Sequence, residues 1–353
     1  MSLEKSIRSI GPRLNLETGL IDMTHGSGGK NSYQLVKEIF SDVFGSAHLM
    51  DKNNYLKAPV GDLVMTTDSF VVSPLFFPGG DIGSLSMHGT INDLAMCGAQ
   101  PLYLTISFII EEGFPLKDLL RISKSLKKTQ EDTGIKIQSG DTKVVERGKG
   151  DGVFITTTGV GILPPSRQPL SLQAIKPKDV ILVNGPLGDH GIAILAHRAH
   201  LDFETQIQSD SAALHTLTEQ MLTKCSGLRY LQDPTRGGLS GCLNEISYAT
   251  GLSIELDSKK IPLRTDVRAA CELLGIDPLV LANEGKLVAI CSADCAEDLL
   301  REMKTHSLGQ NAAIIGTVVE SVESQTPRVT LRTPYGGQKI LNWLSGDQLP
   351  RIC

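Results

Sequence analysis

The sequence predicts an α/β protein of the α+β type, built from two domains. The chain has 353 residues, which is too long for one ordinary hydrophobic core and favours two domains. Short β-branched apolar runs alternate along it with longer stretches of helical periodicity. A proline-rich segment without such a pattern, "LPPSRQPLSLQAIKPKD" at 163–179, is predicted to link two halves of similar size.

The first half is predicted to hold three strands and two helices. One helix spans 81–98, with Asp81 as a favourable N-cap and Gly98 just beyond its end. The other spans 115–134, where helical apolar spacing stops at a glycine. The strands, apolar on both faces, are "LVMTTDSFVV" (63–72), "LYLTISFII" (102–110) and "GVFITTTGVGIL" (152–163).

The second half continues the alternation. The run 179–198 predicts a strand, a glycine-rich turn and a helix. Helices are predicted at 238–251 and 296–306, and strands at 286–292 and 312–319.

Composition excludes several classes of partner. A net charge of −5 gives no reason to expect nucleic acid or an anionic membrane. The N-terminus lacks the apolar region of a secretory signal, and no apolar run is long enough to span a bilayer, so we expect a cytoplasmic protein. Seven cysteines, an odd number, argue against a disulfide framework. The "CSADC" pair, Cys291 and Cys295, lacks the second pair that zinc needs, so two half-buried thiols at a strand end are expected.

Carboxylates interrupt the apolar segments of the first half. Asp68 lies within a strand, Asp93 lies mid-helix in "NDLAMCG", and Asp141 and Lys143 lie in "SGDTKVV", interpreted as a glycine-started turn. A buried carboxylate is costly unless it is paired or bound to metal, although single aspartates also cap helices and turns. Three such positions in one half favour a shared Mg²⁺–phosphate site.

Three glycine-containing stretches remain open to two interpretations each. "HGSGGK" at 25–30 does not have the spacing of a Walker motif, which leaves a flexible leader or a flap that closes over phosphates through Gly28 and Gly29. "DPTRGG" and "NEGK" place Asp233 and Glu284 in turns, where the first could hold metal and the second could act as a base. Taken alone, ordinary turn chemistry is the favoured interpretation of both motifs.

The chain ends on "PRIC". A terminal thiol is easily oxidised, so a cysteine at position 353 is either accidental or the working end of an arm.

Together these motifs carry a resemblance. The runs "TTDSFVVSPLFFPGGDIG", "NDLAMCGAQPLYLT", "SGDTKVVERG", "DPTRGGL", "ANEGKLV" and "PRIC" resemble the HypE family of carbamoyl dehydratases, which serve [NiFe]-hydrogenase maturation. The resemblance extends from about Ile21 to the end. The middle motifs are shared with the wider aminoimidazole ribonucleotide (AIR) synthetase-like superfamily, whereas "PRIC" distinguishes this family. The family's Asp-rich turn is reduced here to "MDKNNYLKAP", which leaves Asp51 to fill that role.

The resemblance implies a PurM-like (AIR synthetase-like) fold with a flexible C-terminal tail and a homodimer joined through the first domains. The implied division is a glycine-rich segment at 1–48, an ATP-binding and dimerisation domain at 49–165, a second domain at 175–335 and a mobile tail at 336–353.

The resemblance also implies ATP-dependent removal of water from a carbamoyl group carried on Cys353, which leaves the cyanide later given to iron. A HypF-like carbamoyltransferase would load the thiol, and a HypC/HypD-like scaffold would receive the cyanide. ATP and Mg²⁺ would be required. The implied site consists of metal ligands Asp51, Asp68, Asp93 and Asp233; phosphate-site residues Gly28, Gly29, Asp68, Asp93, Asp141, Thr142 and Lys143; and catalytic Lys143, Glu284, Arg351 and Cys353.

The implied tail would swing from the surface into the ATP cleft, with Gly336 and Gly337 supplying flexibility and Arg351 lowering the pKa of the neighbouring thiol. Two alternatives stay open. A small-molecule kinase or selenophosphate synthetase-like enzyme would keep its activity without Cys353, and a non-catalytic thiol carrier would not turn over ATP.

Overall fold

A computed structural model describes residues 13–27, 29–44, 59–198, 207–321, 326–343 and 351–352. The predicted site residues Gly28, Asp51 and Cys353 lie outside these ranges. Among the described helices, none is both long and apolar enough to cross a membrane.

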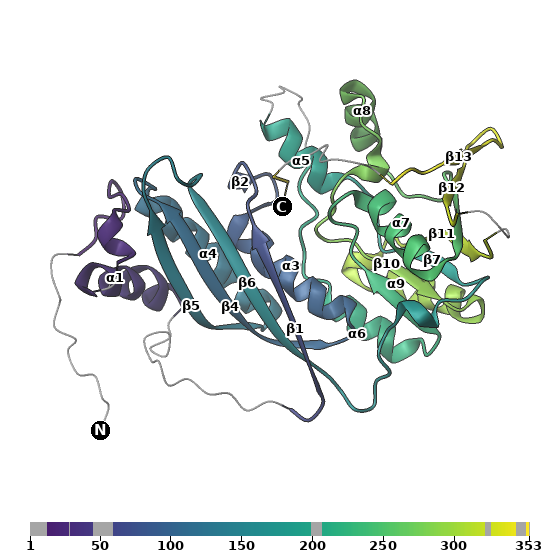
Figure 1. Ribbon diagram of the computed structural model, residues 1–353, viewed down its shortest axis with the longest axis horizontal. Helices are drawn as coiled ribbons and strands as arrows, with labels where there is room; N and C mark the ends of the chain where they lie inside the picture. The colour runs from purple at the N-terminus through teal and green to yellow at the C-terminus, as the bar shows by residue number, and fades with distance from the viewer. Residues whose placement is uncertain are drawn as a thin grey trace.

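The N-terminal segment packs beside the first sheet. It consists of the 3-10 turn η1 (Met23–His25), helix α1 (Gly29–Leu35), the π-helical stretch η2 (Val36–Ser41) and α2 (Asp42–Phe44). Asp22 caps η1 by accepting from the backbone N–H of Thr24 at 2.8 Å. The ring of Phe40 contacts that of Phe108 with centroids 5.0 Å apart. The flexible-leader interpretation is therefore wrong for the described part of this segment, which stands at the β5 side of the sheet (Figure 1).

The first domain is a four-stranded sheet with its helices on one face (Figure 1). The strand order is β1-β6-β4-β5, and only the β4–β5 pair is parallel. Asp81 begins α3 by accepting from the N–H groups of Gly83 and Ser84, as its cap position predicts. The strands and helices are β1 (Asp62–Phe70), β4 (Gln100–Glu111), β5 (Lys136–Val145), β6 (Val153–Leu163), α3 (Ile82–Met96) and α4 (Leu116–Thr133), with a small ribbon of β2 (Phe76–Phe77) and β3 (Gly80–Asp81).

The second face of this sheet is left open by the described residues of the chain. Leu63 and Met65 on β1 are 61% and 60% exposed, and Ile109 on β4 is 43% exposed. Burial alternates along β1 and β4, so one face of each strand is packed and the other is exposed, although the sequence is mostly apolar on both faces. An uncovered sheet face with large apolar side chains is typical of an interaction surface.

The second domain is a seven-stranded mixed sheet of order β13-β12-β9-β11-β7-β10-β8. Its strands are β7 (Val180–Val183), β8 (Leu228–Gln232), β9 (Ser253–Asp257), β10 (Val288–Cys291), β11 (Ala313–Val319), β12 (Val329–Arg332) and β13 (Gln338–Ile340). Its helices are α5 (Asp189–Arg198), α6 (His215–Lys224), α7 (Gly238–Thr250), α8 (Thr265–Leu274) and α9 (Ala296–Thr305), with short 3-10 turns η4 (Leu172–Ala174), η5 (Pro278–Val280), η6 (Ala293–Cys295) and η7 (Ser307–Gly309).

One asparagine joins the two domains. The side chain of Asn92 on α3 donates to the carbonyl of Ala212 at 3.0 Å and accepts from the N–H of Leu214 at 2.7 Å. Asn92 is 1% exposed, so these bonds satisfy a buried amide and fix α3 against the segment that leads into α6.

Every strand and helix predicted from the sequence is present, with shifted ends. The prediction for "SGDTKVV" is wrong, because this stretch belongs to the ten-residue strand β5. Gly336 and Gly337 are also not part of a free tail. They turn the β12–β13 hairpin, in which the Thr333 N–H donates to the Gly337 carbonyl at 2.7 Å. Because Leu341 is also buried, the tail leaves the second domain later than predicted.

Candidate active site

Four of the predicted site carboxylates approach one another between the domains. Asp68 lies on β1, Asp93 on α3, Asp233 directly after β8, and Glu284 in the turn before β10. The Thr66 hydroxyl donates to Asp93 at 2.8 Å, so Thr66 and its i+2 neighbour Asp68 face α3. Elements from both domains therefore build this acidic cluster.

The cluster is electrostatically strained. Burial, followed by the charge of Asp93, raises the pKa of Asp233 to about 7. Burial also raises the pKa of Asp93, against a lowering contribution from the Thr66 hydroxyl. Glu284 is 3% exposed, and burial together with Asp233 raises its pKa well above the ordinary value. Its Oε1 has no hydrogen-bond partner among the described residues, so this buried oxygen is poised for a ligand.

These carboxylates fit a divalent cation held jointly with phosphates. Among the described residues, no three acidic, histidine or cysteine side chains converge on a single metal position. Mg²⁺ usually takes only one or two carboxylates and completes its shell with water and substrate phosphates. A cation near Asp68, Asp93 and Asp233 would relieve the repulsion between carboxylates that helps to raise the pKa values of Asp93 and Asp233.

The raised pKa of Asp233 makes a prediction about stability. Its folded pKa, about 7, lies above the ordinary 3.8, so the folded chain keeps this proton to higher pH than the unfolded chain does. The free energy of unfolding without ligands should therefore fall as pH rises from about 4 towards 7. Asp233→Asn should remove this loss, of which about 3 kcal/mol falls between pH 5 and pH 8, where denaturant unfolding would measure it. Asp62→Asn, at the start of β1, is the control; an unchanged pH slope in Asp233→Asn would contradict the prediction.

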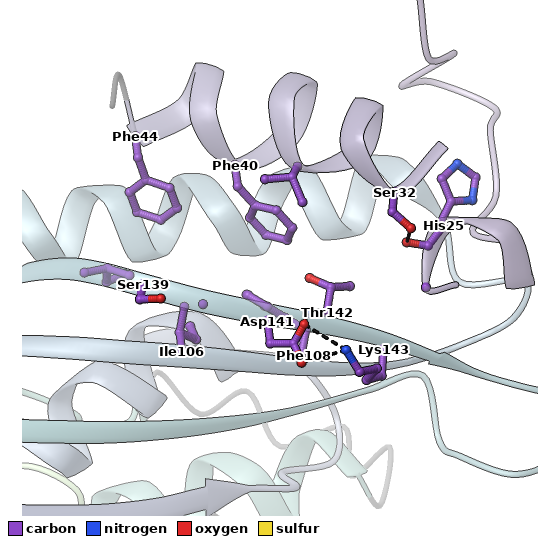
Figure 2. A pocket seen from close by; sticks show the side chains of 14 residues that line it. His25, Ser32, Phe40, Phe44, Ile106, Phe108, Ser139, Asp141, Thr142 and Lys143 are labelled. Atoms are coloured by element: carbon purple, nitrogen blue, oxygen red, sulfur yellow. Dashed lines mark hydrogen bonds and ion pairs between the residues drawn. The ribbon is translucent and has the colours of Figure 1, made fainter. Parts of the chain in front are cut away.

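A second group of predicted residues lines a cavity on β5. The Lys143 ammonium pairs with Asp141 at 2.7 Å, and both side chains are more than half exposed. The cavity of about 230 Å³ lies between strands β4 and β5 and the N-terminal helices (Figure 2). Gly26 approaches β5 so closely that a Cβ there would lie 2.3 Å from the Val144 nitrogen. The lining residues are His25, Gly26, Ser32, Val36, Phe40, Phe44, Ile106, Phe108, Ile137, Ser139, Gly140, Asp141, Thr142 and Lys143.

The two groups are apart within one chain. β1 and β5 are the two edges of the sheet, three interstrand steps of about 4.8 Å from each other. Lys143 is in register with Ile109, on the open face, whereas Asp68 faces α3. A single chain therefore separates Asp141 and Lys143 from the acidic cluster. Gly29 begins α1 with φ +83°, near the β5 cavity rather than the cluster.

The tip of the chain lies on the acidic side. Residues 351 and 352 contact α5, which is labelled in Figure 1, through His190 and Arg198. Ile352 is 5% exposed, and its carbonyl lies 2.7 Å from Nε2 of His190 on α5. Arg351 donates to the Val71 carbonyl at 3.0 Å and forms an ion pair with Asp151. The predicted arginine thus docks on a carboxylate.

Sequence reasoning missed the polar groups that surround Glu284. Asp210 accepts from the backbone N–H of Glu284 at 3.1 Å and from Lys286 at 2.7 Å. Burial opposes ionisation of Asp210, but the charge of Lys286 holds its pKa below the ordinary value. The only local signal was Lys286, which directly precedes the apolar run "LVAIC". A lysine next to a buried strand is expected to need an acidic partner, because a buried ammonium is costly when it is unpaired.

Four of the described cysteines are buried packing residues, whereas Cys97 is exposed. The six described cysteines are free, Cys291 is fully buried at the end of β10, and Cys295 is half-buried. The two thiols flank the strand end as expected, but the expectation that both are half-buried is wrong for Cys291.

Comparisons with known proteins agree with this architecture. The family described as "AIR synthase related protein, N-terminal domain" matches residues 51–163, and its C-terminal counterpart matches 176–326. The chain is 54% identical over 343 residues to "Carbamoyl dehydratase HypE" of Cupriavidus necator, covering 96% of this chain and 97% of that one. It is 41% identical to the Escherichia coli K12 protein of the same description, covering 94% and 99%.

Solved structures show the same relation. "Hydrogenase Maturation Protein HypE in complex with ATP" superposes with a TM-score of 0.89 at 41% identity, covering 94% of this chain and 99% of that one. A chain of a "HypE-HypF complex" gives a TM-score of 0.76 at 45% identity, covering 87% and 99%. The two domains, the carboxylates between them and this similarity along nearly the whole chain together show that the chain belongs to the HypE family of carbamoyl dehydratases, within the PurM-like superfamily.

Proposed function

We propose that this chain uses ATP to convert a thiocarboxamide on its own Cys353 into a thiocyanate. The observation that carries the proposal is the docked end of the chain. The Ile352 carbonyl bonds to His190, which senses the charge of Asp210, and Asp210 accepts from the N–H of Glu284. Residue 353 follows by one peptide bond. A group on its sulfur would therefore be presented towards the acidic cluster that contains Glu284.

The proposed reaction balances as loss of one water. The carbamoyl oxygen attacks the γ-phosphorus of ATP, ADP leaves, and the nitrogen gives up its first proton. Phosphate then leaves with that oxygen as the second N–H proton departs and the C≡N bond forms. Phosphorylation is needed because an amide oxygen is otherwise a poor leaving group. Glu284 is the proposed base or orienter for the N–H protons.

ATP and Mg²⁺ complete the proposed site. Asp68, Asp93 and Asp233 would hold the metal, which would neutralise phosphate charge during phosphoryl transfer. Asp141, Thr142 and Lys143 would lie at the phosphates, where they line the cavity together with Gly26. The relative crystallised with ATP supports a nucleotide site in this fold. Gly28 at the phosphates, Asp51 at the metal and Cys353 as the carrier of the carbamoyl group are also part of the proposal. These three residues lie outside the described ranges.

The partners follow from the chemistry of the terminal thiol. A HypF-like carbamoyltransferase would load it, for which the "HypE-HypF complex" of a relative is a precedent. A HypC/HypD-like iron scaffold would take the cyanide. We place the reaction in the cytoplasm, because ATP and a reduced thiol are both kept there.

We also propose a homodimer through the open sheet face. Leu63, Met65 and Ile109 would be covered if two four-stranded sheets packed face to face, about 10 Å apart. A twofold axis along the strands would place β5 of one copy over β1 of the other. This would bring Lys143 and Asp141 of one chain towards the acidic cluster of its partner, which the single chain keeps apart.

The mass of the C-terminal peptide tests the function. Wild-type protein carbamoylated by its transferase and then given Mg·ATP should lose the mass of one water from the peptide 340–353, released by cleavage after Lys339. Cys353→Ala should acquire no carbamoyl mass on this peptide. Retention of the carbamoyl mass by the wild type would favour the thiol carrier. ATP turnover that survives Cys353→Ala would favour a small-molecule enzyme.

A further inference from the structure

One helix of the second domain holds the end of the chain by its backbone. α5 carries His190 near its start and Arg198 at its end, with Ile194 between them. The i, i+4, i+8 spacing places these three side chains along one stripe of the helix. Ile194 and Ile352 belong to the same buried apolar cluster, and hydrogen bonds from His190 and Arg198 join α5 to the chain end.

The first contact is a histidine that donates to a carbonyl. Nε2 of His190 lies 2.7 Å from the Ile352 oxygen, which can only accept, so Nε2 must carry the proton. Nδ1 lies 2.8 Å from the Ser209 hydroxyl. Burial lowers the pKa of His190, and a neutral ring satisfies both bonds if Ser209 donates to Nδ1. The edge of this ring also meets Phe77, with centroids 5.6 Å apart.

The second contact is an arginine that bridges two carbonyls. Nη2 of Arg198 donates to the Ser73 carbonyl at 2.6 Å and to the Arg351 carbonyl at 2.8 Å. The Ser73 N–H donates to the same Arg351 carbonyl at 3.1 Å. Arg351 has φ 57°, a left-handed conformation that residues with a Cβ rarely adopt. The surroundings therefore hold this residue in one backbone shape.

We propose that His190 and Arg198 form a backbone clamp that positions the C-terminal thiol for dehydration. The clamp accounts for carbonyl recognition at residues 351 and 352, which lie two positions and one position before the thiol. It acts on the docked tail and not on the loading step, which takes place at a partner. His190 and Arg198 are therefore positioning residues. The inference rests on the proposed function only for its catalytic consequence.

Thiol accessibility tests the clamp without ATP, carbamoyl group or partner. We would alkylate the full-length protein with iodoacetamide and follow the peptide 340–353 by mass spectrometry, since Cys353 is its single cysteine. His190→Ala and Arg198→Ala should each speed alkylation of this peptide by roughly three- to tenfold, the loss of one hydrogen bond. His190→Gln should stay near the wild-type rate, because its amide can donate to the same carbonyl.

A matched control separates the clamp from general loosening. Arg167 also donates to a backbone carbonyl, that of Gly98 at 2.7 Å, but at a site away from the tail. Arg167→Ala should leave the alkylation rate unchanged. Equal alkylation rates in wild type, His190→Ala and Arg198→Ala would overturn the clamp, as would a His190→Gln variant as fast as His190→Ala.

Separate measurements of carbamoylation and of dehydration test whether the clamp acts in catalysis. His190→Ala and Arg198→Ala should accept the carbamoyl group at least as fast as wild type but should remove water more slowly in a single turnover. Equal slowing of both steps would indicate a general defect and contradict the positioning role. If alkylation responds as expected but wild type never loses water, the clamp stands and the proposed dehydration fails.

Discussion

Glu284→Gln should stop nitrile formation while leaving the protein carbamoylated. The glutamate is buried, and its Oε1 lacks a partner among the described residues, so the isosteric amide keeps the packing but cannot accept a proton. We expect the peptide 340–353 to keep its carbamoyl mass after Mg·ATP is added. Any trapped phosphate adduct should appear in this variant.

Lys143→Ala should fail earlier, before ATP is consumed. Lys143 is proposed to neutralise charge on the phosphoryl group as it is transferred. Its loss should therefore slow ATP consumption by carbamoylated protein about 100- to 1,000-fold. No phosphate adduct should form. Lys128→Ala is a close control, because Lys128 is likewise an exposed lysine paired with an aspartate, at 2.9 Å from Asp132. Normal dehydration by Lys143→Ala would remove β5 from the phosphate site. Normal dehydration by Glu284→Gln would remove Glu284 from proton transfer.

Two inactive variants should restore activity to each other if the site is shared between chains. Lys143→Ala damages β5 and Asp93→Asn damages the acidic cluster, and the proposed dimer combines the β5 of one chain with the cluster of the other. Denaturing and refolding an equal mixture should yield half mixed dimers, each with one intact site. Activity should therefore recover to roughly a quarter of the wild-type value.

The control for complementation uses two lesions of one group. Lys143→Ala mixed with Asp141→Ala should recover nothing, because every shared site would lack one of the two β5 residues. Sedimentation would establish that the mixtures contain dimers. Mixed dimers of Lys143→Ala and Asp93→Asn that stay inactive would contradict a shared site.

Much of the secondary structure could be predicted from the sequence, because it depends on near neighbours. The cap at Asp81 and the glycine at 134 mark helix ends through their own backbone contacts, and the structure has both. β5 could not be predicted in this way. Its Gly140 and Asp141 are typical of turns, and only pairing with β4 makes the stretch a strand.

The tail shows the same limit. Two consecutive glycines are typical of a flexible joint, but Gly336 and Gly337 form a hairpin turn because β12 already pairs with β9 and offers β13 an edge. No local pattern distinguishes these two outcomes. The position at which the tail leaves the second domain thus depends on a sheet assembled from distant segments.

By itself the sequence determined the α/β alternation, the two-domain division, the family and the residue types of the candidate site, because these reside in local patterns and motifs. The tertiary structure decided which of those residues meet. Strand order places β1 and β5 at opposite edges and so divides the predicted site into two groups. Packing of α5 against β2 and the chain end selects His190 and Arg198, whose importance no neighbouring residue signals. Burial, which sums contributions from both domains, sets the charge state of Asp233 and Glu284.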